Sequence, residues 1–397
     1  MISNRQLFLM HQAQTSHFPL MLEIERAEEV YLFDVNGKQY LDLISGISVS
    51  SLGHGNEHVK NAIKLQLDKY MHLMVYGEYI QSPQVQLAKM LTDLLPPNLN
   101  SVFLVNSGSE ATDGALKLAK RVTGRTEIIA CKNAYHGSGH AALSLNSHEY
   151  FKNAFRPLLP DINFIEFNNE SSLENITNKT ACVIVETIQG EAGYIQPQND
   201  FLKKLRAKCD EHSVLLILDE IQAGMGRTGK LFAFEHYGIV PDILLLGKAL
   251  GAGMPIGAFI SSQAMMMELA DNPVLGHITT FGGHPVIAAA AIAGIEEIKS
   301  HNWINEVEEK ENLFRELLIH PSIKNISGKG LMLAIEFDNF EFNKKLIDAC
   351  IEDGLISDWF LFASHSLRIA PPLIISIEQI KWSCEILLKN IEKLSIF

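Results

Sequence analysis

From about residue 100 to residue 265, short apolar runs alternate with longer amphipathic segments, and this alternation constrains the fold more than any other feature. Apolar runs bounded by polar or glycine-rich residues predict strands, and the amphipathic segments at 109–121 and 201–212 predict helices between them. Such alternation produces a mostly parallel sheet with helices on both faces. We therefore predict an α/β fold with strands at 102–105, 127–130, 163–167, 181–185, 214–218, 243–246 and 257–260.

The chain changes character after about residue 285. An Ala/Ile-rich helix at 285–299 and a charged amphipathic helix at 303–318 precede a strand at 330–337 and two further helices, which together predict a smaller α+β domain. Alternating residues at 30–43 predict a hairpin that joins this domain. The expected division is an N-terminal segment 1–45 joining the small domain, a large domain 46–284 and a small C-terminal domain 285–397.

Composition narrows the classes of partner. The formal net charge of −13 argues against a nucleic-acid backbone or an anionic membrane as the main partner. No apolar stretch approaches a membrane span, and no signal-peptide core follows the N-terminus. Five widely spaced cysteines without a paired ligand pattern predict reduced thiols and no metal site. We therefore expect a cytoplasmic protein that acts on small molecules; the cysteines are Cys131, Cys182, Cys209, Cys350 and Cys384.

Lys248 stands at the end of the apolar run 243–247, and a glycine-rich stretch follows it. Glycines after a buried strand leave the backbone open to a ligand. A lysine placed there is desolvated, loses its proton more easily and becomes a nucleophile. Taken alone, a lysine in such a sequence is more often a solvated loop residue, so its partners decide the interpretation.

Three further motifs follow strands of the same predicted sheet. Asp219, with Glu220, ends the run 215–218, and the carboxyl edge of an α/β sheet is where ligands bind. The alternative for this pair is a capping Asp beside a solvated Glu. Tyr135 and His136 follow another strand and add an aromatic face and an imidazole to the same edge, although such a pair taken alone is more often packing.

The third motif, Ser107-Gly108-Ser109, lies between a strand and a helix. Either serine can cap the helix, and the glycine lets the backbone approach a ligand. The free N–H groups and the helix dipole then form an anion site suited to a phosphate. A well-capped turn without a ligand is the equal alternative.

Two near matches to nucleotide motifs occur at 224–230. The glycines at 224, 226 and 229 satisfy a dinucleotide pattern, and 224–230 also spells a phosphate-loop motif, but Leu231 stands where a Ser or Thr should hold magnesium. Neither match lies directly between a strand and a helix. We interpret the segment as a turn-rich loop.

Taken together, the phosphate cradle, aromatic face, buried acid and desolvated lysine select one cofactor. Pyridoxal phosphate needs an anion site for its phosphate, a lysine for its aldehyde and a carboxylate that keeps its ring nitrogen protonated. A nucleotide site has no use for the pair formed by Lys248 and Asp219. The sequence therefore predicts a pyridoxal-phosphate enzyme.

The chain closely resembles the class III aminotransferases, the fold-type I pyridoxal-phosphate enzymes that include acetylornithine and ornithine aminotransferases. The resemblance extends from Gly46 and Leu52-Gly53-His54-Gly55 to the segment 367–373, and the run 218–257 is its most specific part. It implies a large domain with a mostly parallel central sheet and a smaller α+β domain. It also implies a homodimer, because the family shares phosphate ligands across a two-fold interface.

The resemblance implies a role for each matching residue. Lys248 would form the Schiff base with the cofactor and then move the proton between the substrate α-carbon and the cofactor. The other implied cofactor-binding residues are Asp219 at the ring nitrogen, Gln222 at the ring hydroxyl, Tyr135 stacked on the ring with His136 beside it, Glu186 near the cofactor, Ser107, Gly108 and Ser109 at the phosphate, and Thr280 from the partner subunit.

Substrate recognition follows the same resemblance, with one departure. Arg368 would bind the α-carboxylate of glutamate, and Glu191 would mask it when the other substrate is bound; a purely structural ion pair is the alternative. Ornithine-type members carry an arginine where this chain has Ser138, so acetylornithine is not secure as the donor. His140 and Lys132 are possible substitutes, and Tyr76 is a candidate for lining the donor pocket.

The expected activity is transfer of an amino group, including an ω-amino group, from an amino acid or amine to 2-oxoglutarate or a similar keto acid. A racemase or aminomutase on the same scaffold is the alternative within the cofactor class, and it would release no keto acid. A non-catalytic cofactor-binding protein would have no chemical need for both Lys248 and Asp219. The donor, the preferred acceptor, the pathway and any assembly beyond a dimer are left open by the sequence.

Overall fold

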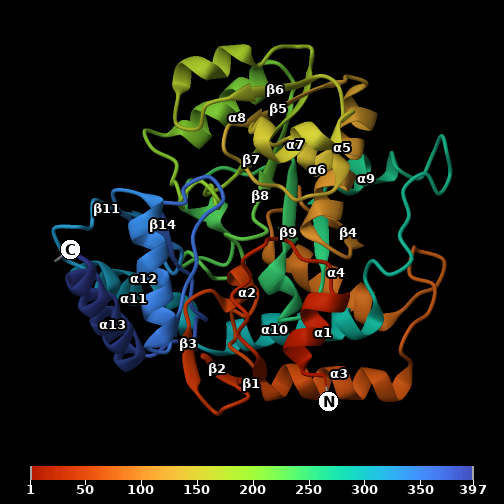
Figure 1. Ribbon diagram of the computed structural model, residues 1–397. Coiled ribbons are helices and arrows are strands. Elements are labelled where there is room, and N and C mark those ends of the chain that lie inside the picture. The colour runs from red at the N-terminus through yellow and green to blue at the C-terminus, as the bar shows by residue number, and fades with distance from the viewer. Residues whose placement is uncertain (1, 396–397) are drawn as a thin grey trace.

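The computed structural model describes residues 2–395, and the seven predicted strands pair into one sheet in the order β4-β10-β9-β8-β7-β5-β6 (Figure 1). Neighbours from β9 to β6 are parallel, and β10 runs antiparallel to both of its neighbours. The predicted α/β architecture is confirmed. The strands are β4 (Ser101–Val105), β5 (Glu127–Cys131), β6 (Ile162–Ile165), β7 (Thr180–Glu186), β8 (Leu215–Asp219), β9 (Ile243–Gly247) and β10 (Gly257–Ser261).

Both faces of this sheet are buried, because alternate side chains of each strand enter two different cores. In β7, Cys182 and Ile184 pack toward α5 (Gly108–Thr123), whereas Val183 and Val185 face the opposite layer. That opposite layer contains α3 (Glu57–Lys69), α4 (Ser82–Leu94), α8 (Phe201–Glu211) and α10 (Pro285–Ser300).

The N-terminal hairpin and the C-terminal third of the chain form two smaller sheets over a separate core. One sheet has the order β1-β2-β3-β13, so β13 near the C-terminus pairs in parallel with β3. The predicted hairpin is confirmed, and its turn is held by Asp34, whose Oδ1 accepts from the backbone N–H groups of Asn36 and Lys38. These strands are β1 (Ile24–Glu28), β2 (Tyr31–Asp34), β3 (Gln39–Asp42) and β13 (Leu355–Ile356).

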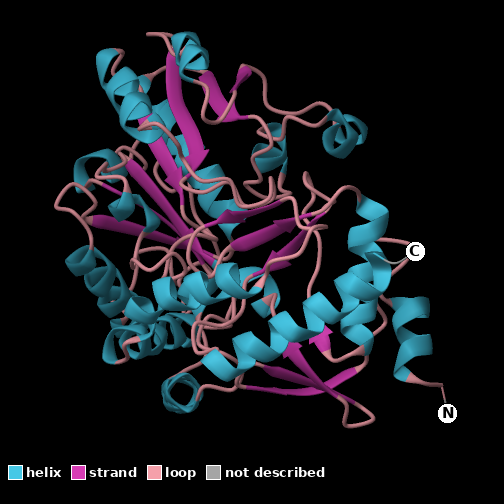
Figure 2. Ribbon diagram, turned by 90° about the vertical axis from the view of Figure 1, so that its left-hand side faces the viewer, coloured by secondary structure: helices cyan, strands magenta, loops and turns pink. Residues whose placement is uncertain are grey.

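The other small sheet is antiparallel, in the order β11-β12-β14. Its strands are β11 (Asn325–Gly328), β12 (Leu333–Glu336) and β14 (Ser366–Ile369), and the helices around it are α11 (Trp303–Leu317), α12 (Phe340–Glu352) and α13 (Ile377–Ser395). Figure 2 shows separate groups of strands with helices packed around and between them. The sequence did not predict β1, β11, β13 or β14, because short strands without clear alternation give no periodic signal.

The predicted strand 330–337 is shorter than expected and begins at Leu333, since a turn closed by a hydrogen bond from Lys329 N to Met332 O precedes it. Helix α10 packs into the core of the large sheet. The domain boundaries stay a prediction.

The remaining elements are short, apart from the N-terminal helix α1. They are α1 (Asn4–His11), α2 (Ser45–Ser48), α6 (His140–Ser144), α7 (Glu149–Lys152), α9 (Gln263–Met267) and the 3-10 turns η1 (Asn153–Phe155), η2 (Glu170–Asn175), η3 (Ala233–His236) and η4 (Lys248–Gly251).

The loop that carries the two nucleotide-like patterns is structural. Its fully buried Arg227 donates from Nη1 to the carbonyl oxygens of Leu331 and Pro371 and from Nη2 to Ser51 Oγ at 2.8 Å. The loop therefore ties the large sheet to the C-terminal part. Within residues 2–395, no helix is long and apolar enough to span a membrane.

Candidate active site

Three predicted residues meet at the carboxyl edge of the large sheet because their strands are adjacent. Glu186 ends β7, Asp219 ends β8, and the two are directly opposite in the strand register. Lys248 follows β9, the next strand. Neighbouring strands lie about 4.8 Å apart, so the register alone brings these side chains together. We call Glu186, Asp219 and Lys248 the floor; it lines a cavity of about 220 Å³.

Lys248 is held in an unusual conformation. Its φ is 46°, in the left-handed region that a residue with a long side chain rarely adopts, and it begins the tight turn η4. Burial lowers the pKa of Lys248, and the charge of Glu191 opposes the shift only in part. No hydrogen bond or ion pair joins its Nζ to another group within residues 2–395. The amine is therefore free to react with a ligand in the cavity.

Asp219 is buried and bonded on both oxygens. Its Oδ2 lies 2.7 Å from His136 Nδ1, and its Oδ1 accepts from Ile221 N at 2.9 Å. Burial lowers the pKa of His136, but the hydrogen bond to Asp219 and the charges of Asp219 and Glu186 outweigh it, so the pKa is raised overall. The contacts with Asp219 and Glu186 therefore favour the protonated form of the imidazole. The sequence placed His136 at this edge but gave no sign that it would hold Asp219.

Glu186 takes part in backbone contacts. Its Oε2 accepts from Tyr135 N at 3.3 Å and its Oε1 from Gly190 N at 2.9 Å, which fixes two loops above the sheet. Burial raises the pKa of Glu186 to about 7, with the positive charge of His136 acting against the rise. Glu186 therefore titrates near neutral pH.

The predicted anion site falls at the N-terminus of the 16-residue helix α5. Ser107 caps the helix by accepting from Glu110 N, and Gly108 and Ser109 open its first turn. Ser109 Oγ accepts from Gly139 N at 3.0 Å. A Cβ on Gly139 would lie 2.8 Å from that oxygen, so a larger residue there would displace the Ser109 hydroxyl. The N–H groups of a helix's first turn have no partner within the helix and attract an anion.

The remaining walls of the cavity combine aromatic, apolar and amide groups. Tyr135 lines it, and the Tyr135 hydroxyl lies 3.1 Å from Ser138 Oγ. Gln222 is also a lining residue. Gly137, next to the predicted His136, also lines the cavity, and three further lining residues were not predicted: Ile188, Ile221 and Ala223. Their positions directly after β7 and within the segment after Asp219 are the sequence signal that could have identified them.

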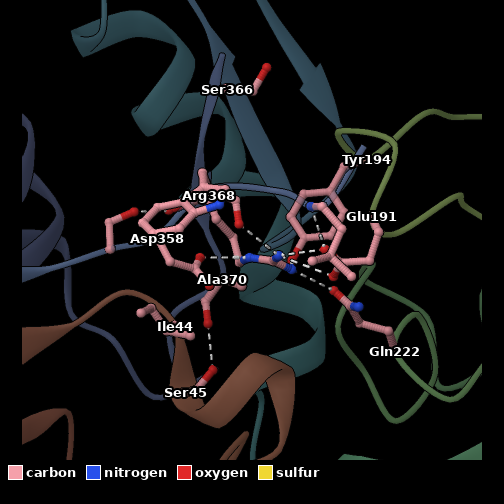
Figure 3. A network of polar contacts seen from close by, with 12 residues as sticks. Ile44, Ser45, Glu191, Tyr194, Gln222, Asp358, Ser366, Arg368 and Ala370 are labelled. Carbon is pink, nitrogen blue, oxygen red and sulfur yellow. Dashed lines mark hydrogen bonds and ion pairs between the residues drawn. The ribbon is translucent and has the colours of Figure 1, made fainter. Parts of the chain in front are cut away.

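Arg368 is buried on β14 and lies in a cluster of polar side chains, shown in Figure 3. Both oxygens of Glu191 lie 3.1 Å from Arg368 Nη2, and Asp358 Oδ1 accepts from Nε at 2.8 Å. Nη1 donates to the Tyr194 hydroxyl at 3.2 Å and to Gln222 Oε1 at 3.4 Å. We call these five residues the arginine cluster. Burial opposes the guanidinium charge, but Tyr194, Asp358 and Glu191 raise the pKa of Arg368 overall.

The predicted partnership between Arg368 and Glu191 is thus present, whereas Asp358 and Tyr194 were not predicted. A second carboxylate ten residues before the arginine, and a tyrosine three residues after Glu191, carry no distinct pattern in the sequence.

Two predicted residues lie away from this cavity. Tyr76 lines a second cavity of about 480 Å³, next to Thr279, and Thr280 is exposed in the loop before α10. Lys132, a possible substitute for the missing arginine, is instead bonded through Nζ to Glu166 at 2.9 Å. His140 is exposed at the start of α6, and neither Lys132 nor His140 lines the cavity of the floor.

The functional groups around the cavity match the chemistry of pyridoxal phosphate. Lys248 offers an amine for the aldehyde, Asp219 a carboxylate for the ring nitrogen, and the first turn of α5 an anion site for the phosphate. His136 also lines the cavity, and its buried Nε2 has no hydrogen-bond partner within residues 2–395. An α/β sheet with this edge defines a pyridoxal-phosphate enzyme of fold type I.

Comparison with known proteins gives the family. Residues 12–391 match the model of the family described as aminotransferase class-III. An acetylornithine aminotransferase of Archaeoglobus fulgidus is 39% identical over 368 residues, which cover 92% of this chain and 94% of that protein. A LysW-aminoadipate semialdehyde/glutamate semialdehyde transaminase of Sulfurisphaera tokodaii is 38% identical over 79% of this chain and 81% of its own length.

Solved structures agree with this result. The ornithine aminotransferase of Toxoplasma gondii, described with partial occupancy of pyridoxal phosphate at its active site, superposes with a TM-score of 0.91. It is 29% identical and covers 98% of this chain and 93% of its own. A transaminase from a marine Virgibacillus has a TM-score of 0.93 at 26% identity, with 99% of each chain covered. The chain belongs to the class III aminotransferases and is a pyridoxal-phosphate-dependent aminotransferase.

Proposed function

We propose that this aminotransferase moves an amino group, including an ω-amino group, from an amino acid or amine to 2-oxoglutarate or a similar keto acid. The observation that supports this proposal is that the arginine cluster adjoins the floor. Gln222 lines the same cavity as Lys248, and its Oε1 lies 3.4 Å from Arg368 Nη1. A substrate whose amine reaches Lys248 can therefore place a carboxylate at Arg368. An aminotransferase needs this pairing because two different substrates share one pocket.

Lys248 and Asp219 would have different roles in the reaction. Pyridoxal phosphate, when bound, supplies an aldehyde that captures the amine and a ring that accepts electron density from the substrate α-carbon. Lys248, with its lowered pKa, would accept a proton from that carbon and return it. Asp219, held in place by its hydrogen bond to His136, would keep a negative charge at the ring nitrogen. Gln222 and Tyr135 would position the ring, and the first turn of α5 would hold the phosphate.

Glu191 would act as a removable mask on Arg368. When the donor lacks a carboxylate at this position, the ion pair between Glu191 and Arg368 keeps the guanidinium neutralised. When glutamate or 2-oxoglutarate enters, its carboxylate would replace Glu191. An unpaired buried guanidinium is unfavourable by about 3–5 kcal/mol, so the exchange must leave Arg368 with at least one carboxylate partner.

Ser138 bears on the choice of donor. Its hydroxyl is exposed and contacts Tyr135, and Lys248 is the only lysine or arginine among the residues that line the cavity in residues 2–395. Replacing a charged bidentate contact with a neutral hydroxyl weakens carboxylate binding by about 2–4 kcal/mol. We propose that the preferred donor is an amine or ω-amino compound without a strongly bound distal carboxylate, and that acetylornithine reacts poorly.

The test is a half-reaction screen of the wild type and Arg368→Ala, following the cofactor's visible absorbance. The panel contains glutamate, acetylornithine, ω-amino acids, diamines and carboxylate-free amines. Arg368→Ala is expected to weaken the reaction with glutamate about 30-fold and to leave the best carboxylate-free donor within about threefold, because only glutamate uses the guanidinium. Equal losses for both would mean that Arg368 is structural and would contradict the proposal.

We further propose a homodimer in which Thr280 of the partner subunit joins the phosphate site. Around the second cavity, the polar side chains of Gln81, Gln84 and His277 include buried atoms without a hydrogen-bond partner in residues 2–395. The same face exposes Ile80 and Val274. Unpaired polar atoms beside exposed apolar side chains favour a protein partner that supplies the missing contacts.

Sedimentation velocity of the cofactor-loaded enzyme tests this assembly. A species of twice the monomer mass is expected at micromolar concentration, and Thr280→Ala is expected to weaken cofactor binding. A monomer that retains full cofactor affinity would contradict the proposal.

A cytoplasmic location is supported by the five cysteines, all of which are buried free thiols, and fractionation of the source cells would test it.

A further inference from the structure

The arginine cluster contains two carboxylates for one guanidinium. Glu191 accepts a hydrogen bond from Arg368 Nη2, and Asp358 accepts one from Nε at 2.8 Å. Figure 3 shows Glu191, Tyr194 and Gln222 on one side of the arginine side chain and Asp358 on the other. With all three ionised groups charged, the cluster carries one excess negative charge. One carboxylate can therefore move away while the other still neutralises the guanidinium.

The two carboxylates belong to different parts of the chain. Glu191 lies in the loop after β7 of the large sheet, whereas Asp358 lies between β13 and β14, close in sequence to Arg368 itself. The segment around Asp358 is bonded directly to β14: Arg368 N donates to Asp358 O at 3.0 Å, and Ser357 Oγ donates to Arg368 O at 2.6 Å. Asp358 is therefore joined directly to the strand that carries Arg368, whereas Glu191 comes from the large-sheet side and meets the same segment through hydrogen bonds from Leu361 N and Phe362 N.

The same segment also wraps the rest of the guanidinium. Trp359 O accepts from Nη2 at 3.4 Å, and the ring of Phe360 lies 4.3 Å from the guanidinium carbon. Leu361 N donates to Glu191 Oε2 at 3.1 Å. Six consecutive residues, 357–362, thus contact either Arg368 or Glu191. A guanidinium fixed at Nε and stacked on an aromatic ring keeps its plane when a contact at Nη2 is exchanged.

We infer that Asp358 is a positioning residue that fixes the guanidinium of Arg368 while Glu191 gives way to a substrate carboxylate. This inference rests on the proposed role of Arg368 as the carboxylate-binding group. Asp358 does not touch substrate in this arrangement. Its Oδ1 holds Nε, so that Nη2 stays turned toward the place that Glu191 vacates. The substrates concerned are those with two carboxylates, as in glutamate and 2-oxoglutarate.

The experiment compares variants of the loaded enzyme by stopped-flow half-reactions with glutamate. Asp358→Ala removes the acceptor and is expected to raise the apparent Kd for glutamate about tenfold, with the limiting rate and the cofactor affinity within about twofold. Asp358→Asn keeps an oxygen acceptor for Nε and is expected to stay within about threefold of the wild type. Should Asp358→Ala fail to fold, Asp358→Ser, whose side chain is too short to reach Nε, replaces it.

Asp353→Ala is the matched control, because Asp353 also pairs with a cation in the C-terminal part, Lys389 at 2.9 Å, but does not touch Arg368. It is expected to leave the Kd for glutamate unchanged. Unchanged glutamate binding in Asp358→Ala, a parallel loss of cofactor affinity, or equal defects in the Ala and Asn variants would each overturn the inference. If Arg368→Ala itself binds glutamate normally, the proposed function fails instead, so the two failures are distinguishable.

Discussion

The floor and the arginine cluster lie side by side yet are built in opposite ways. Glu186 and Asp219 are direct partners in the register of β7 and β8, and Lys248 begins the turn after β9. Their positions follow from strand pairing within one sheet. The arginine cluster instead gathers residues from loops after β7 and β8, from the segment before β14 and from β14 itself.

This difference in construction indicates which part of the site can rearrange when substrate binds. Each floor carboxylate is fixed by backbone N–H groups, as Asp219 is by Ile221 and Glu186 by Gly190. Moving either would break a contact with the main chain. In the arginine cluster, Arg368 has several alternative partners, so the loss of one leaves others in place. We therefore expect changes in the floor to alter the chemical step and changes in the cluster to alter substrate choice.

Lys248→Ala should produce the largest effect. Loss of the only amine at the floor is expected to lower kcat at least about 1,000-fold and to abolish the cofactor's lysine-dependent visible absorbance band, because both the attachment point and the proton carrier disappear. Steady-state kinetics and absorbance spectra measure the two effects. Lys132→Ala, which removes an exposed ion pair with Glu166 beyond the same sheet edge, is the control and should behave as the wild type.

Asp219→Asn should have the next largest effect. An amide keeps the size of the side chain but removes the charge, so kcat is expected to fall about 100-fold, and the pKa of His136 is expected to fall because its carboxylate partner is gone. Kinetics and imidazole ¹⁵N NMR follow the two changes. Asp242→Asn, which affects a carboxylate paired with Arg206 at the opposite edge of the sheet, should reduce stability and spare kcat. Similar losses of kcat in both variants would contradict the special role of Asp219, because Asp242 lies away from the floor.

The pH dependence of stability should give the smallest effect. Burial raises the pKa of Glu186 to about 7 from an ordinary 4.5, so the folded state favours its protonated form. That contribution is complete below about pH 4.5 and is lost as the pH rises toward 7; the raised pKa of His136 acts with the same sign. Relative to the wild type, Glu186→Gln should therefore gain unfolding free energy on the order of 2 kcal/mol from pH 5 to pH 8.

Urea denaturation at the two pH values measures this gain. Glu316→Gln, at an exposed position on α11, is the control and should change the difference by less than about 0.5 kcal/mol. A gain in Glu186→Gln no larger than that of the control would show that Glu186 is ionised without penalty in the folded protein.

The sequence by itself is sufficient to predict the large sheet and the residues at its edge. Buried parallel strands give continuous apolar runs, and a polar residue directly after such a run must lie at the edge of the sheet. Strand periodicity and position alone therefore assign Asp219 and Lys248 to one edge. The apolar pattern also predicts a strand at 163–167, but β6 ends at Ile165, because it pairs only with β5 and stops where β5 stops.

The tertiary structure alone decided the contacts that connect distant segments. The bond from His136 to Asp219 spans 83 residues, and the contact between Glu191 and Arg368 spans 177. Asp358 is close to Arg368 in sequence, yet its role depends on the fold of the β13–β14 segment, whose strands are too short to give a periodic pattern. Strand periodicity is a local property and can be read from a chain, whereas a buried ion pair forms only where packing brings its two members together.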